Sequence, residues 1–212
     1  MNKTQMIKQL NDCKVVAVIR SNDAENVYGT VDACVQGGIR AIEITYTVPG
    51  ATHIIEELSK KYAGTDVMIG AGTVIDAETG RNAILAGAEF IVSPTIDEKL
   101  IELCCRYRIL CAAGAFTPNE VKTALELGAD YVKIFPATLC TPSYLKVIHG
   151  PFPQAEFMVT GSMSFDTVKD WLDCGASVIG VGGFITDPAA RNDFEQVTKN
   201  AKRLCEIIHG GK

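Results

Sequence analysis

The sequence predicts an α/β fold, a TIM-type (β/α)8 parallel barrel preceded by a short N-terminal helix. Short apolar runs alternate eight times with helical patterns along the 212 residues. Strands that are apolar on both faces fit a parallel sheet covered by helices. Glycine-led dipeptides end several helices just before the next strand: Gly37-Gly38, Gly87-Ala88, Gly128-Ala129 and Gly175-Ala176.

The chain length predicts a single barrel domain over residues 1–212. Roughly 26 residues per unit is compact for a fold that typically has about 250 residues. The alternative is an open doubly wound sheet. No strand in the sequence leads into a G-x-G-x-x-G motif, which would have indicated dinucleotide binding in such a sheet.

The first elements have the clearest signals. Residues 4–12 form a predicted helix because Met6, Ile7 and Leu10 share one face. The run at 15–20 stays apolar until Arg20, which predicts the first strand. Ser21-Asn22-Asp23 can cap the helix that follows, and that helix extends to residue 36.

The same strand and helix patterns then recur seven times. β-branched and apolar runs predict the remaining strands at 41–45, 67–71, 89–93, 110–113, 130–135, 156–159 and 178–181. Amphipathic stretches between and after them predict helices at 51–62, 76–86, 97–107, 118–127, 143–148, 164–173 and 188–208.

Composition excludes several classes of protein. The net charge of −5, with no basic cluster, argues against a nucleic-acid partner. No apolar run has the length of a membrane span, and the first residues lack the apolar core of a signal peptide. We therefore expect a cytoplasmic protein with no membrane partner, in which the eight cysteines are buried reduced thiols.

Lys133 is the most informative residue, because a charged side chain interrupts an apolar strand. Lysine is almost never buried unless it is paired or functional. Alternation along the strand places Lys133 and Phe135 on one face. Lys133 is either half of a structural ion pair with Glu43 or a Schiff-base lysine, whose neutral amine is favoured by low dielectric and nearby positive charge.

Glu43 interrupts the second strand in the same way, between Ile42 and Ile44. It is either the charge partner of Lys133 or Arg20, or a general acid/base with a pKa raised by burial. These two interpretations are compatible with each other.

Other polar or flexible residues also fall at the C-terminal ends of strands, where barrels of this class carry their sites. Arg20 is either solvated or a bidentate clamp for a substrate carboxylate. Thr73 either caps a helix or donates its hydroxyl to the same carboxylate, and Gly72 would permit a close backbone approach. Pro94 follows the fourth strand.

Two glycine-containing loops follow the last two strands. Thr160-Gly161-Ser162 and Gly182-Gly183 could hold a phosphate through backbone N–H groups, or they could simply be tight turns. No clustered Asp/His set predicts a metal site, and no histidine falls at a strand end.

These residues occur in the order seen in one enzyme family. The run 15–20, Glu43-Ile44-Thr45, Gly70-Ala71-Gly72-Thr73, Ser93-Pro94, the run 133–137 and Thr160-Gly161 resemble the 2-keto-3-deoxy-6-phosphogluconate (KDPG) / 4-hydroxy-2-oxoglutarate (KHG) aldolases. The resemblance extends from about residue 6 to the C-terminus. It implies a class I carbon-carbon lyase without metal or cofactor that releases pyruvate and an aldehyde, glyceraldehyde 3-phosphate or glyoxylate, from a 2-keto acid.

The resemblance also implies roles for individual residues. Lys133 would form the imine, Glu43 would move protons, and Thr73 would bind the pyruvate carboxylate. Pro94 and Phe135 would line the pocket, and the protein would be a homotrimer. Without the resemblance, a sugar-phosphate isomerase or epimerase, or a barrel without catalysis, remains open.

The chain departs from the family pattern in two places. Some members have an arginine where this chain has Thr47, so we expect Arg20 to hold the carboxylate. The family often has Pro-Thr-Gly-Gly after the seventh strand and a small residue after the eighth, where this chain has Ser162 and Phe184. If Phe184 turns inward, we expect weak binding of phosphorylated substrates. If it turns outward, backbone amides would still hold phosphate.

Overall fold

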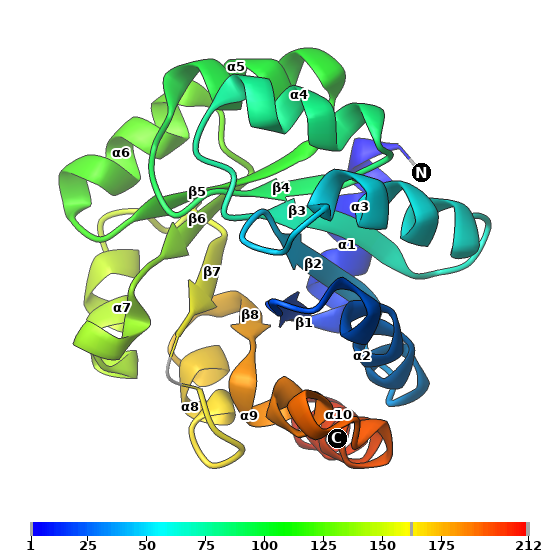
Figure 1. The fold of residues 1–212 in the computed structure, drawn as a ribbon. Coiled ribbons are helices and arrows are strands. Elements are labelled where there is room, and N and C mark those ends of the chain that lie inside the picture. Colours follow the sequence, from blue (N-terminus) through cyan, green and yellow to red (C-terminus); the bar gives the residue numbers. More distant parts are fainter. Residues whose placement is uncertain (1, 162, 211–212) are drawn as a thin grey trace.

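The eight predicted strands close into a parallel barrel in sequence order, from β1 round to β8 and back to β1 (Figure 1). The computed structural model describes residues 2–161 and 163–210. The strands are β1 (Val15–Ile19), β2 (Ala41–Thr45), β3 (Met68–Gly72), β4 (Phe90–Val92), β5 (Leu110–Ala115), β6 (Tyr131–Ile134), β7 (Phe157–Thr160) and β8 (Ala176–Val181). The predicted fold class is confirmed.

Helices surround the barrel and connect successive strands (Figure 1). They are α1 (Lys3–Cys13), α2 (Ala24–Gln36), α3 (Ala51–Lys61), α4 (Ala77–Leu85), α5 (Glu98–Tyr107), α6 (Pro118–Leu127), α7 (Pro142–His149), α8 (Val168–Asp173), α9 (Gly183–Thr186) and α10 (Phe194–His209), with 3-10 turns η1 (Ala137–Leu139) and η2 (Asp187–Arg191).

The glycines that were expected to end helices do so in the left-handed region. Their φ angles are 103° at Gly38, 100° at Gly87, 91° at Gly128 and 107° at Gly175. A residue with a Cβ rarely adopts these angles, so glycine at these positions allows each helix to stop abruptly and the chain to enter the next strand.

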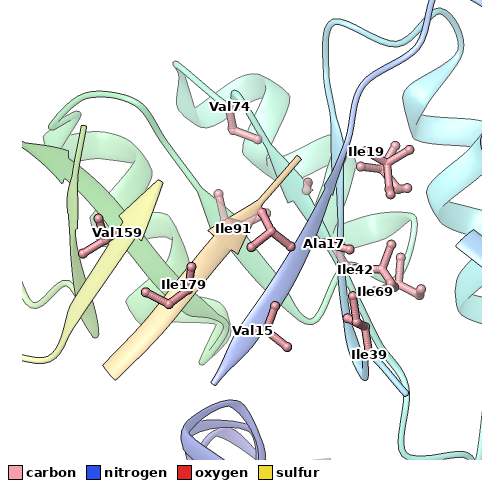
Figure 2. Close-up of a cluster of buried hydrophobic side chains, with 14 of the residues drawn as sticks. Val15, Ala17, Ile19, Ile39, Ile42, Ile69, Val74, Ile91, Val159 and Ile179 are labelled. Carbon is pink, nitrogen blue, oxygen red and sulfur yellow. The ribbon is translucent and has the colours of Figure 1, made fainter. Parts of the chain in front are cut away.

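An apolar layer between strands and helices forms the larger part of the core. Outward-facing residues of the strands pack there against the helices, and Figure 2 shows part of this cluster, with Val15, Ala17 and Ile19 on β1 and Ile42 on β2. All four side chains are at most 1% exposed. Burial on this scale supplies the main stabilisation of the barrel, at roughly 25 cal/mol per Å² of apolar surface.

A second apolar cluster fills the barrel interior at the N-terminal ends of the strands, and α1 closes it. Met6 and Leu10 of α1 pack against interior residues such as Phe90. The hydroxyl of Tyr131 donates to Asn11 Oδ1 at 2.7 Å, which satisfies the polar end of a side chain that is 2% exposed. We call this end of the barrel the closed end.

A cavity of about 560 Å³ lies beside the closed end. Both ends of the described chain contribute to it, because Gln5 of α1 and His209 of α10 line it together with Arg40, which precedes β2. The N- and C-terminal helices therefore meet on the face opposite the C-terminal ends of the strands.

The predicted boundaries fail near the C-terminal part of the chain. The last helix was expected from residue 188, but α10 begins at Phe194. Asn192 adopts a left-handed φ of 58°, and the Asp193 side chain accepts a hydrogen bond from Gln196 N, so a new helix starts there. The helix expected from residue 164 begins at Val168, after a turn in which Ser164 N donates to Thr167 Oγ1.

Two further expectations concern the environment of the protein. None of the helices within residues 2–161 and 163–210 is long and apolar enough to cross a bilayer. All eight cysteines are free thiols, but the expectation that they are buried holds only for Cys34, Cys104 and Cys111. Cys105 is exposed and the other four are half-buried, so for these five it was wrong.

Candidate active site

Lys133 lies inside the C-terminal end of the barrel. It is on β6, is 5% exposed, and pairs in register with Gly114 of β5. Its Nζ lies 4.9 Å from the ring centroid of Phe135, which is 38% exposed at the rim. The expectation that Lys133 and Phe135 share one face is confirmed. We call this end of the barrel the mouth.

Glu43 lies in the same interior, on β2, and is 1% exposed. Its Oε2 atom is buried and has no hydrogen-bond partner among the described residues. No ion pair within 4.0 Å joins Glu43 to Lys133 among the ion pairs of residues 2–161 and 163–210. The interpretation of Lys133 and Glu43 as a tight structural ion pair is therefore not supported.

Gly72 makes room for the Glu43 carboxyl group. A Cβ atom at residue 72 would lie 1.8 Å from Glu43 Oε1 and 2.4 Å from Cδ. The sequence suggested that Gly72 permits a close backbone approach. In the structure a side chain of the neighbouring strand, Glu43, makes such an approach to Gly72.

Burial shifts both titratable groups toward their neutral forms. It raises the pKa of the Glu43 carboxyl, although the positive charges of Lys133 and Arg20 oppose this rise. It lowers the pKa of Lys133, and Arg20 lowers it further, while the charge of Glu43 opposes both effects. An amine with a lowered pKa is nucleophilic nearer neutral pH, and a carboxyl with a raised pKa can both donate and accept protons there.

Arg20 and Thr73 meet across the rim of the mouth. Arg20 follows β1 and is exposed, and its Nη2 atom donates to Thr73 Oγ1 at 3.4 Å. Thr73 has a φ of 55°, an unusual angle for a β-branched residue. A guanidinium and a hydroxyl side by side can bind a carboxylate.

Thr47 is part of a small hydrogen-bonded group. It stands where the sequence pattern described above has arginine in some members. Its hydroxyl lies 2.8 Å from that of Thr45, which also donates to Ile19 O at 3.1 Å. Arg20 is thus the arginine that the structure places next to Thr73.

Pro94 lies close to the strand that adjoins Lys133. A Cβ atom at Gly114 would lie 2.1 Å from Pro94 O, so the backbone of residue 94 rests directly on β5. Because Gly114 pairs with Lys133, this contact brings the loop after β4 to the side of the lysine.

A cavity of about 250 Å³ occupies the other side of the mouth. Its lining includes five residues that the sequence singled out, Thr160, Gly161, Gly182, Gly183 and Phe184, together with Val18, Met163 and Gly180. Ser162, the remaining candidate of this group, lies outside the described residues. Phe184 also contributes to the lining, and the expectation that an inward-turned ring weakens phosphate binding stays a prediction.

Three lining residues were missed from the sequence. Val18, Met163 and Gly180 are apolar or small, and nothing in their type indicates a site. Alternation could have found two of them, since Val18 precedes Arg20 by two positions and Gly180 precedes Gly182 by two.

Comparisons with known proteins bear on this arrangement. A family model described as KDPG and KHG aldolase matches residues 6–200. The 2-dehydro-3-deoxy-phosphogluconate aldolase of Haemophilus influenzae is 28% identical over 208 residues, covering 96% of this chain and 97% of that protein. The KHG/KDPG aldolase of Escherichia coli K12 is 30% identical over 214 residues, covering 99% and 98%.

A solved structure agrees with the fold as well. The KDPG aldolase of Legionella pneumophila, crystallised with pyruvate captured as a covalent carbinolamine, superposes with a TM-score of 0.85 and 26% sequence identity. The superposition covers 95% of this chain and 98% of that one.

Proposed function

The chain belongs to the KDPG and KHG aldolase family, and from this premise we propose that it cleaves a 2-keto-4-hydroxy acid through an imine on Lys133. It is a class I aldolase that forms pyruvate. The observation that carries the role of Lys133 is its environment. It is a buried amine with a lowered pKa, it has no close ion pair within the part of the chain that the structure describes, and it shares the mouth with a buried carboxyl.

The bonds form and break in the following order. The neutral amine of Lys133 attacks the keto carbon, C2, and uptake of one proton with loss of water gives a protonated imine. The C3–C4 bond then breaks, and its electron pair moves into the imine to give an enamine. The C4 hydroxyl loses its proton and becomes the carbonyl of the aldehyde. Protonation of the enamine at C3 restores the protonated imine, and addition of water at C2 then releases pyruvate, one proton and the neutral amine.

Glu43 is suited to the proton transfers of this sequence. We assign it the removal of the proton from the C4 hydroxyl and the return of a proton to C3. Its raised pKa lets one group perform both steps, because the two protonation states are closer in energy than for a solvated carboxylate.

The pyruvate carboxylate is assigned to Arg20 and Thr73, which are hydrogen-bonded to each other at the rim. Pro94 and Phe135 would flank the three-carbon unit, since one rests on β5 beside Lys133 and the other lies over its amine. This assignment gives the positively charged side of the mouth to the carboxylate.

Further proposals follow from the family and the sequence. Residues 1–212 would act as one aldolase domain in the cytoplasm, with no cofactor, assembled as a homotrimer. The aldehyde would be glyceraldehyde 3-phosphate or a related aldehyde if the substrate is of the KDPG type, and glyoxylate if it is 4-hydroxy-2-oxoglutarate.

Trapping the imine tests the proposal. The protein is incubated with pyruvate and sodium borohydride, and its intact mass and tryptic peptides are measured. One reduced pyruvate is expected on Lys133, and Lys133→Met should abolish the adduct while leaving the circular dichroism spectrum unchanged. An isomerase or a barrel without catalysis would give no adduct, and that result would refute the aldolase mechanism for this chain.

A further inference from the structure

The cavity between β7, β8 and β1 is lined without charge. Among the described residues that form it, the side chains are those of Val18, Thr160, Met163 and Phe184, and the rest is glycine. At about 250 Å³ it is smaller than typical drug-sized ligand pockets, which suits a short carbon chain.

The Phe184 ring is held in place by a second ring. Phe184 and Phe165 pack edge to face, with ring centroids 5.2 Å apart and planes at 90°. The guanidinium carbon of Arg203 lies 4.2 Å from the centroid of Phe165. The Arg203 guanidinium thus lies over the ring of Phe165, and that ring packs against Phe184, which contributes to the lining of the cavity.

A negatively charged side chain lies against Gly183. Asp187 Oδ1 lies 2.7 Å from the position that a Cβ atom on Gly183 would occupy. An exposed carboxylate at this place repels a dianion more than it repels a neutral group, although solvent screens part of the effect.

The polar side chain of the cavity is able to bind a hydroxyl group. The Oγ1 atom of Thr160 is buried and has no hydrogen-bond partner among the described residues. A substrate hydroxyl could satisfy it, since buried polar groups are normally hydrogen-bonded.

Strand order places this cavity on the aldehyde side of the substrate. The ring runs β6, β7, β8, β1, β2, so the cavity lies between the strand of Lys133 and the strand of Glu43. If the carboxylate of the keto acid is at Arg20 and Thr73 and its C2 is at Lys133, the carbons beyond C3 extend toward β7 and β8.

We propose that this aldolase prefers 2-keto-3-deoxy acids whose aldehyde-derived end is uncharged and carries hydroxyl groups, over those that end in a phosphate. The proposal rests on the assignment of Lys133 as the imine-forming residue. A phosphate would lose hydration in a cavity whose described lining offers it no cation, so backbone N–H groups alone would have to offset the unfavourable desolvation of a dianion.

The experiment begins with the borohydride adduct, so that two failures can be told apart. In the synthetic direction, pyruvate is then offered glyceraldehyde or glyceraldehyde 3-phosphate, and kcat/KM is measured for each. We expect glyceraldehyde to be preferred by about tenfold or more. An adduct on Lys133 with equal rates, or with preference for the phosphorylated aldehyde, overturns this inference alone. Absence of the adduct overturns the proposed function itself.

Two substitutions at residue 184 sharpen the test. Phe184→Ser should lower the preference several-fold by improving kcat/KM for the phosphorylated aldehyde, whereas Phe184→Leu keeps an apolar wall and should keep the preference. Leu85→Ser is the matched control, because Leu85 is 67% exposed on α4. A preference that is the same in Phe184→Ser, Phe184→Leu and Leu85→Ser would contradict the role of the ring. If Phe184→Ser does not fold, the rates of the unmodified enzyme still decide the question.

Discussion

The two ends of the barrel interior are built from the same strands but treat their polar groups differently. The polar group at the closed end is hydrogen-bonded, and polar groups in the mouth are left available. On β6, Tyr131 at the closed end is packed among apolar residues and its hydroxyl is bonded to Asn11, whereas Lys133, two positions later, has no close ion pair among the described residues. On β7, Met158 packs into the closed end, and the hydroxyl of Thr160 in the mouth has no hydrogen-bond partner within residues 2–161 and 163–210.

This difference indicates how stability and reactivity are separated in one short fold. The closed end and the outer apolar layer stabilise the barrel. That stabilisation offsets the burial of an amine and a carboxyl in the mouth, which is unfavourable by itself. Substitutions at the two ends should therefore have different consequences, and the following predictions test this, from the largest expected effect to the smallest.

Glu43→Gln should have the largest effect on chemistry. An amide of nearly the same size cannot accept and return the proton, so kcat should fall by about 10²–10⁴-fold. The pyruvate adduct trapped on Lys133 by borohydride should still form, and steady-state kinetics with intact-mass measurement would show both results. Full turnover in this variant would exclude Glu43 as the proton-transfer group.

Phe90→Ala should act on stability. Phe90 is 2% exposed in the closed end, and loss of its ring should lower the free energy of unfolding by about 3–5 kcal/mol. Urea denaturation measures this change. The folded fraction should still form the Lys133 adduct. Leu85→Ala, at an exposed position, is the control and should change stability by about 0.5 kcal/mol or less. Equal effects of the two variants would contradict the role of the closed end.

Gly72→Ala should reduce turnover through the position of Glu43. The added methyl group would overlap the carboxyl, and displacement by about 1 Å can lower a rate by about 10²-fold. We expect kcat to fall while the KM for the keto acid and the melting temperature change little. A fall in melting temperature with unchanged kcat in the folded protein would mean that Gly72 serves packing and not catalysis.

The pH dependence of imine formation should shift in opposite directions in two variants. The charge of Glu43 raises the pKa of Lys133 and that of Arg20 lowers it. Glu43→Gln should therefore lower this pKa further and move the rise in adduct formation to lower pH, because more amine is neutral there. Arg20→Met should move it to higher pH. Reductive trapping over a pH series measures both, and shifts of the same sign would contradict the electrostatic account.

Much of the fold could be predicted from the sequence, because each strand is a distinct apolar run and glycines end several helices. The break between η2 and α10 could not, since it depends on the left-handed conformation of Asn192. Lys133 and Glu43 could be found because charge stands out in an apolar strand.

The rest of the mouth depends on contacts between residues that are distant in sequence. That Gly72 accommodates the carboxyl of Glu43, and that Phe184 packs on Phe165, follows from how strands and loops come together. Val18 and Met163 have no chemical signature of their own. Their place beside Thr160 is a property of the closed ring of strands.

The position of the two chain ends has a practical consequence. Gln5 and His209 line one cavity beside the closed end of the barrel, which α1 covers. An affinity tag or a surface linkage at either end would thus attach the protein through its closed-end side and leave the mouth facing the solution. Immobilised in this way, the barrel should exchange pyruvate and aldehyde with the medium as freely as the untethered protein.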